Sequence, residues 1–122
     1  MNYSELATNF LNAYYNTMMT NRAQMLNYYR ENSQMSYEGD NCVGLKAIME
    51  KLEGLSFKTI TYKFESFCFQ PTLLPNSLLL VVNGTLHMDG QDTFNFYQTF
   101  LLVQEQSGNY YLANDILKLI IE

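Results

Sequence analysis

The 122-residue chain has no tryptophan, only two cysteines and two prolines, and a single histidine. Cys42 and Cys68 have no paired spacing, so the sequence contains neither a disulfide framework nor a zinc-binding pattern. Two unpaired cysteines fit the reducing environment of the cytosol or nucleus. His87 stands next to an expected turn, where an exposed position is more natural than a catalytic one. We therefore expect no metal site, no cofactor and no catalytic residue.

Long apolar runs and clustered basic residues are also missing. No uninterrupted apolar stretch approaches the roughly 18 residues of a membrane span, and the N-terminus lacks the pattern of a secretory signal. The seven basic residues are scattered from Arg22 to Lys118, and the net charge is −5. Because phosphate binding needs clustered Lys and Arg, we expect no nucleic acid partner and no membrane insertion. A partner with a basic face fits the charge better.

The chain is rich in side chains that build a core. Apolar residues make up 48% of the sequence and aromatic residues 15%, which excludes a disordered chain. A length of 122 residues allows a real core but not two of them. We therefore predict one domain over residues 1–122.

The first half of the chain has the periodicity of helices. Ser4 can cap a first helix, whose apolar residues recur every four positions at Leu6, Phe10, Tyr14 and Met18. Asn21 predicts a break, after which a second short helix runs through Met25, Leu26 and Tyr29. A third helix is expected over residues 43–55.

The second half alternates with the period of two that is typical of strands. Strands are expected over residues 58–69, 78–88, 93–104 and 110–121, after a short strand that ends near residue 37. Asp89-Gly90 is the strongest hairpin signal. The order of elements predicts the α+β class, a cone-shaped domain of three N-terminal helices packed on a strongly curved, mostly antiparallel sheet.

An aromatic residue and a carboxylate stand together in Tyr37-Glu38-Gly39, between the short strand and the third helix. Such a corner belongs at the open mouth of a cone-shaped domain, where these folds bind their partners. Glu38 has no obvious packing task at the end of a strand. It is therefore the strongest candidate for a functional residue.

Eight segments resemble the nuclear transport factor two family in order and nearly in spacing, and together they cover essentially the whole chain. They are FLNAYY (10–15), SYEG (36–39), VGLKAI (43–48), EKL (50–52), LSF (55–57), QP (70–71), FYQTFLL (96–102) and NDI (114–116). The resemblance implies a homodimer that carries the GDP form of the small GTPase Ran into the nucleus. It also implies contact with phenylalanine-glycine repeats of nucleoporins. Such a protein would occur in the cytoplasm and nucleus and concentrate at the nuclear pore.

The resemblance also assigns residues by position. An aromatic residue of the Ran switch region would enter an apolar cavity lined by Tyr37, Leu55, Ile60, Phe94, Ile116 and Leu117. Acids on the rim, Glu38 and Asp89 with Asp92 as a further candidate, would pair with Ran lysines. Nucleoporin repeats would dock at Tyr3, and the dimer would form through the open face of the sheet at Val81, Tyr97 and Ile116.

Each of these assignments has a purely structural alternative. The four aliphatic cavity residues are ordinary core residues in most folds, and Phe94 can pack across strands. Asp89 is the first residue of an Asp-Gly turn, and Tyr3 can form a hydrophobic staple ahead of a Ser4 cap. The chain departs from the family at Gln91, where a second rim acid is usual. Tyr3 and Tyr37 stand where the family often has tryptophan.

Two other functions remain possible on the same fold. An isomerase or dehydratase would use Tyr14 or Tyr15 with Glu38 and Asp115 to move protons. Ten tyrosines and twelve acidic residues produce such a grouping by chance, so we predict that the chain is not an enzyme. An adaptor would bind pore repeats but not Ran, and Gln91 is the residue that keeps this alternative open.

Overall fold

The computed structural model describes residues 2–55, 59–90 and 92–120, and of Asp92 only the backbone. The helices are α1 (Tyr3–Thr20), the 3-10 helix η1 (Arg22–Tyr28) and α2 (Leu45–Glu53). The strands are β1 (Gln34–Tyr37), β2 (Asp40–Val43), β3 (Ile60–Pro71), β4 (Ser77–Met88), β5 (Asp92–Gln104) and β6 (Tyr110–Ile120). These elements confirm the predicted α+β class.

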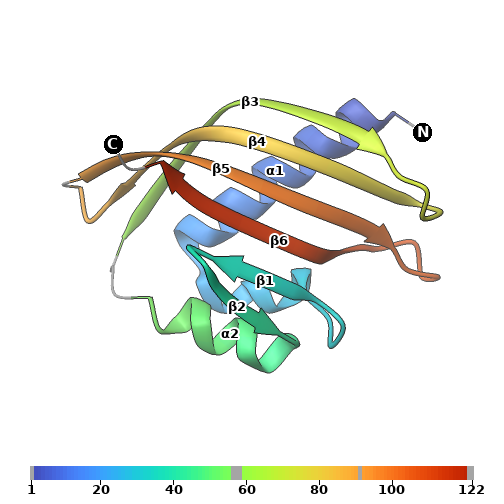
Figure 1. Cartoon of the computed structure of the whole chain (residues 1–122), viewed down its shortest axis with the longest axis horizontal. Coiled ribbons are helices and arrows are strands. Elements are labelled where there is room, and N and C mark those ends of the chain that lie inside the picture. Colours follow the sequence, from blue (N-terminus) through green and yellow to red (C-terminus); the bar gives the residue numbers. More distant parts are fainter. Residues whose placement is uncertain (1, 56–58, 91, 121–122) are drawn as a thin grey trace.

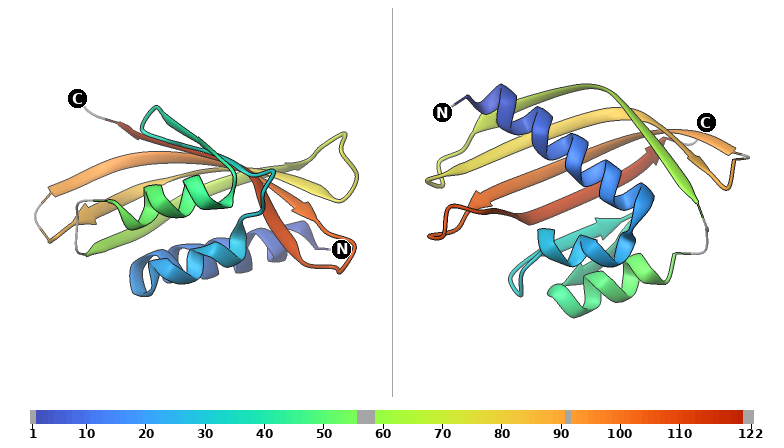
Figure 2. Two further views of the ribbon diagram at one scale, coloured as in Figure 1. Left: turned by 90° about the horizontal axis from the view of Figure 1, so that it is seen from below. Right: turned by 180° about the vertical axis from the view of Figure 1, so that it is seen from behind.

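The six strands of the described residues form one sheet in the order β2-β1-β6-β5-β4-β3. All neighbours are antiparallel except β1 and β6. The long strands bend across α1, and β1 and β2 pass close to α2 (Figure 1). The helices lie on one side of the sheet (Figure 2). The sheet therefore has a helix-covered face and an open face.

Strand alternation divides the side chains between these two faces. The helix-covered face carries the core residues Leu78, Leu80, Val82 and Leu86 of β4 and Phe96, Phe100 and Leu102 of β5. On the open face, Val81 lies opposite Thr99, and Thr99 lies opposite Ile116. The side chains of Val81 and Ile116 remain 43% and 47% exposed. Apolar surface is thus left uncovered on the open face.

The cap of helix α1 is Asn2, two residues before the expected cap Ser4. The Oδ1 atom of Asn2 accepts a hydrogen bond from the backbone N–H of Glu5 at 3.1 Å, which is the N-cap geometry. The prediction that Ser4 caps the helix is therefore wrong. Tyr3 is the first residue of the helix, so it cannot be a staple that precedes a Ser4 cap.

The third helix is shorter than predicted because a strand occupies the residues before it. Asp40–Val43 pairs with Gln34–Tyr37 as an antiparallel hairpin, and Gly44 then turns the chain with φ 91°. Helix α2 starts only at Leu45 and ends at Glu53. The hairpin places the Glu38-Gly39 turn at one end of the sheet.

Gly84 allows β3 to bend over the core. A bulge shifts the register of β3 between Phe64 and Ser66, directly beside Gly84. A Cβ atom at Gly84 would lie 2.2 Å from the carbonyl oxygen of Lys63 and 2.7 Å from Cα of Phe64. Only glycine fits this close approach of two backbones.

We expect Gly84→Ala to lower the free energy of unfolding by about 3 kcal/mol, because the backbone of β3 must move to accept the methyl group. Urea unfolding measures this loss. The neighbouring Thr85→Ala change is the control and should cost less than about 1 kcal/mol. Equal stabilities of the two variants would show that the bulge accommodates a side chain.

Candidate functional site

Five of the predicted cavity residues lie at or near the ends of elements that meet where β1 and β6 end and β3 and β5 begin (left side of Figure 1). Leu117 and Ile60 are buried, whereas Tyr37, Leu55 and Phe94 are half-buried against the same core. We call this group of five residues the mouth. Two of its members are buried aliphatic side chains, and two are partly exposed aromatic rings.

Ile116 does not belong to the mouth. It adjoins Leu117 on β6, but successive residues of a strand point to opposite faces. Leu117 is 2% exposed on the helix-covered face, and Ile116 is 47% exposed on the open face. Its assignment to the cavity was therefore wrong, and its assignment to the open face with Val81 and Tyr97 agrees with the register.

Met88 and Leu119 extend the apolar surface around the mouth and were not predicted. Met88 lies opposite Ile60, and Leu119 lies opposite Phe96, so both belong to the helix-covered face. Both side chains are half-buried against the core. Their alternation along β4 and β6 was the signal that would have identified them.

The ring of Tyr37 is a wall of the mouth with a polar atom inside it. The hydroxyl is buried beside the side chain of Tyr62. Burial raises the pKa of Tyr37 to about 12. The Nζ atom of Lys51 lies 5.8 Å from the ring centroid and pairs with Asp40 at 2.7 Å.

Glu38 follows Tyr37, is partly exposed, and stabilises the pairing of β1 with β6. Its backbone adopts φ 51°, and its N–H donates to the carbonyl of Leu117 at 3.1 Å. One carboxylate oxygen accepts the backbone N–H of Leu119, and the other lies 3.9 Å from Nζ of Lys118. The expectation that Glu38 has no packing task was therefore wrong. It extends the β1–β6 pairing by one residue.

Asp89 has the structural role that its turn predicted. It adopts φ 53°, and its Oδ1 atom accepts the backbone N–H of Thr59 at 2.9 Å. The N–H of Asp89 donates to the carbonyl of Thr59, also at 2.9 Å. These bonds close the ends of β3 and β4. Gln91 and the side chain of Asp92 lie outside the described residues, so their rim roles stay predictions.

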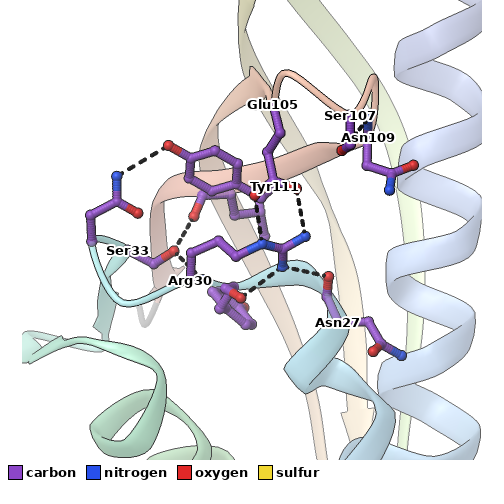
Figure 3. Close-up of polar contacts among 10 residues, drawn as sticks. Asn27, Arg30, Ser33, Glu105, Ser107, Asn109 and Tyr111 are labelled. Atoms are coloured by element: carbon purple, nitrogen blue, oxygen red, sulfur yellow. Dashed lines mark hydrogen bonds and ion pairs between the residues drawn. The ribbon is translucent and has the colours of Figure 1, made fainter.

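An arginine clamp fixes the loop that leads into β1. Arg30 donates from Nε and Nη2 to both carboxylate oxygens of Glu105, at 2.9 and 3.0 Å. Its Nη1 atom donates to the carbonyls of Asn27 and Tyr29, so the guanidinium is surrounded by acceptors (Figure 3). The clamp ties the loop to the turn between β5 and β6. It thereby anchors the beginning of the hairpin that carries Tyr37 and Glu38.

A buried carboxylate lies on the helix-covered face of β6. Asp115 is 1% exposed, and its Oδ2 atom accepts hydrogen bonds from the hydroxyls of Tyr14 and Tyr29 at 2.8 and 2.7 Å. Its Oδ1 atom accepts from Nε2 of Gln98 at 2.7 Å, and Tyr15 donates to Oε1 of Gln98. Burial raises the pKa of Asp115, and these hydrogen bonds offset part of the rise.

This cluster explains the acid and tyrosines that suggested an enzyme. Burial raises the pKa of Tyr14 and Tyr29 well above 10, so both hydroxyls remain donors at neutral pH. Tyr14 bonds Asp115 directly, whereas Glu38 binds the backbone of β6 instead. The structure thus separates the proposed catalytic set. Gln98 and Tyr29 complete the cluster and were not predicted.

Tyr3 and the open face are the remaining predicted surfaces. Tyr3 is half-buried at the start of α1 and neighbours Tyr110. Burial is the main cause that raises the pKa of Tyr110, and the nearby Tyr3 hydroxyl raises it further. On the open face, Tyr97 is 43% exposed and lies opposite Asn83 and Lys118. In the described residues, no cluster of His, Cys, Asp or Glu could hold a metal ion. No helix there is long and apolar enough to cross a membrane.

Comparisons with known proteins agree with this architecture. The sequence model of the Nuclear transport factor 2 (NTF2) domain matches residues 6–119. Nuclear transport factor 2 of Schizosaccharomyces pombe is 36% identical over 117 residues, which cover 96% of this chain and 95% of that protein. The Saccharomyces cerevisiae protein of the same name is 33% identical over 120 residues, covering 98% and 95%.

Solved structures match as well. Nuclear transport factor 2 from Cryptosporidium parvum superposes with a TM-score of 0.90 at 25% identity, covering 96% of this chain and 94% of that one. A putative dehydratase of the NTF2-like family from Streptomyces avermitilis has a TM-score of 0.82 at 10% identity, with 97% and 96% covered. At that identity the likeness concerns the fold alone.

Proposed function

The chain belongs to the nuclear transport factor 2 family, and on this premise we propose that it carries Ran bound to GDP into the nucleus. Its named relatives are transport factors, so the chain is a nuclear transport factor and not an enzyme. That the cargo is Ran bound to GDP is a more specific proposal, and it rests on the arrangement of the mouth.

The proposal rests on the adjacent positions of Tyr37 and Glu38. A half-buried ring lines an apolar mouth, and the adjacent carboxylate stands on the rim with its side chain 27% exposed. In a typical interface, a few buried anchors, often aromatic, contribute most of the affinity. Rim charges contribute orientation and partner choice. The mouth suits an aromatic anchor that is flanked by basic residues.

Selectivity for GDP would come from the partner. If the switch segment of Ran exposes its aromatic anchor only in the GDP state, the mouth can bind that state selectively without contacting the nucleotide. The resemblance implies a second rim acid at position 91, and Gln91 in its place would weaken binding without affecting the anchor. Tyr37 stands in place of a larger indole, and its ring still offers a flat apolar face for contact.

The open face is proposed as the interface with a second copy of the chain. Val81, Tyr97 and Ile116 lie on three neighbouring strands and are each more than two-fifths exposed. Uncovered apolar side chains on adjacent strands are typical of protein interfaces. The mouth is assigned to the opposite face, so dimerisation would leave it uncovered.

Phenylalanine-glycine repeats of nucleoporins are proposed to contact Tyr3, and this would concentrate the protein at the pore. The half-buried ring of Tyr3 beside Tyr110 offers an apolar surface for an inserted phenylalanine. We expect Tyr3→Ala to weaken binding of a repeat peptide by about tenfold, equivalent to about 1.4 kcal/mol, and to leave Ran binding unchanged. Equal loss of both activities would instead indicate a folding defect.

Calorimetric titration with Ran loaded with GDP, and separately with a non-hydrolysable GTP analogue, tests the carrier function. We expect binding to the GDP form and at least a hundredfold weaker binding to the other form. Binding to neither form would refute the proposal and favour the adaptor that binds pore repeats alone. Equal binding to both forms would place the contact outside the switch region.

A further inference from the structure

Strand β3 is the outermost strand of the sheet on the side opposite the hairpin (Figure 1). Edge strands are usually protected from added strands by charges, bulges or proline. In β3, the protecting features are Lys63, Glu65, the bulge between Phe64 and Ser66, and the final Pro71. They surround but do not interrupt residues 66–70, Ser-Phe-Cys-Phe-Gln, which carry no charge. We call this segment the edge window.

The backbone groups of the edge window that face outward can be assigned from the register. In an antiparallel pair, opposed residues alternate between pairs that exchange hydrogen bonds and pairs that do not. In the Thr59–Asp89 pair, the N–H of Asp89 donates a hydrogen bond to the carbonyl of Thr59. The N–H of Tyr62 points away from β4, because it donates to Sδ of Met19 at 3.3 Å. Tyr62 is therefore a residue of β3 whose backbone N–H and C=O groups point away from β4.

The same alternation along β4 continues beyond the bulge. Leu86 faces Tyr62, and the β4 residues that share its orientation, Val82, Leu80 and Leu78, face Phe67, Phe69 and Pro71. The N–H and C=O groups of Phe67 and Phe69 therefore point out of the sheet. Pro71 agrees with this assignment, since proline is tolerated in a strand where no ladder N–H is needed.

We propose that an extended peptide segment of another protein binds at the edge window by strand addition. Its backbone would pair with the outward N–H and C=O groups of Phe67 and Phe69, the mode by which many domains capture extended peptides. This site is separate from the mouth and does not depend on the proposed binding of Ran.

Side chains on both faces indicate what the peptide carries. On the helix-covered face, the half-buried rings of Phe67 and Phe69 lie 6.5 Å apart. On the other side, a hollow of about 230 Å³ borders the edge, lined by Cys68, Phe69, Gln70, Leu79 and Val81. Val81 also belongs to the proposed dimer face, so the peptide would use the part of the hollow beside Cys68 and Gln70. Successive residues of an added strand would alternate between these two surfaces. The peptide is therefore expected to be uncharged and to carry apolar side chains.

The length of the edge window argues for a peptide and against a second copy of the chain. Five residues of strand span about 17 Å. A ladder of this length buries far less than the roughly 800 Å² per partner of a stable protein interface. Glu65 and Pro71 limit its extension at either end. A short segment gains most of its affinity from the backbone bonds and needs no longer contact.

Methylated peptides test the backbone pairing. The probe is the capped peptide Thr-Val-Thr-Phe-Thr-Val-Thr. One form is methylated on the backbone nitrogens of the two Val residues and the Phe residue, and another form on those of the Thr residues at the third, fifth and seventh positions. Only one set of N–H groups can face β3. We expect one form to lose at least tenfold in affinity while the other stays within about threefold of the unmethylated peptide. Equal losses, or no binding of the unmethylated peptide at millimolar concentration, would overturn the proposal.

Amide hydrogen exchange, measured residue by residue by NMR with the whole chain, locates the bound peptide. Saturation with the unmethylated probe should slow exchange of the Phe67 and Phe69 amides at least tenfold. Cys68 and Gln70 already face β4, so their amides serve as internal controls and should change little. Protection elsewhere without protection of Phe67 and Phe69 would refute strand addition.

Discussion

Glu38→Lys is expected to abolish detectable binding of Ran bound to GDP, a loss of at least a hundredfold in calorimetric titrations. The change places a positive charge on a rim that is proposed to face Ran lysines. Like charges brought together in an interface cost several kcal/mol, and a hundredfold loss corresponds to about 2.7 kcal/mol. Undiminished affinity would remove Glu38 from the binding site.

The structural role of Glu38 requires a matched control. Lysine also removes the acceptor for the Leu119 N–H, so a loss of binding could reflect a disturbed strand. Glu38→Gln keeps an oxygen for that hydrogen bond and removes only the charge. We expect this variant to keep the wild-type melting temperature and to bind Ran about tenfold more weakly. Wild-type affinity of Glu38→Gln would show that the lysine variant fails for structural reasons.

Asp115→Ala is expected to lower the free energy of unfolding by about 4 kcal/mol. The change leaves the hydroxyls of Tyr14 and Tyr29 and the amide of Gln98 without their acceptor, and it opens a small cavity in the core. Such a loss is a large part of the stability of a small domain. Urea unfolding at neutral pH measures it, and a loss below 1 kcal/mol would show that the cluster rearranges freely.

The pH dependence of Asp115→Asn isolates the charge. The folded state raises the pKa of Asp115 above the ordinary 3.8, so it holds the proton more tightly than the unfolded state does. This contribution favours folding below pH 3.8 and is lost as pH rises through the raised pKa. We therefore expect wild type to lose stability relative to Asp115→Asn as pH rises from 3 upward. A gap that does not change with pH would contradict the raised pKa.

Sequence patterns predicted the long strands well because their burial is regular. Alternation over twelve or so residues places one face on the core, and tertiary packing then preserves the pattern. The hairpin strand Asp40–Val43 was missed because it is short, and two of its four residues are Asp40 and Asn41. Its stability comes from pairing with β1, which is not visible in its own residues. The following helix was consequently drawn too long.

The cavity assignment stays a prediction. The resemblance placed Tyr37, Leu55, Ile60, Phe94 and Leu117 in one cavity, and in the structure each of them belongs to the core or packs against it. Ile116 could have been excluded from the strand period alone, since its neighbour Leu117 faces the core. The clamp between Arg30 and Glu105 joins residues 75 positions apart, and no local pattern connects them. The hydrogen bonds that Glu38 makes with the backbone likewise involve β6, a strand that lies much later in the sequence.

Methyl NMR of the labelled protein during titration with Ran bound to GDP tests most directly whether the mouth is the binding site. Leu117 and Ile116 adjoin on β6 but point to opposite faces, so each is the control for the other. The account predicts shifts at the methyl groups of Leu117, Leu55 and Leu119, with Ile116 and Val81 unchanged. Shifts confined to Ile116 and Val81 would contradict it and place Ran on the open face.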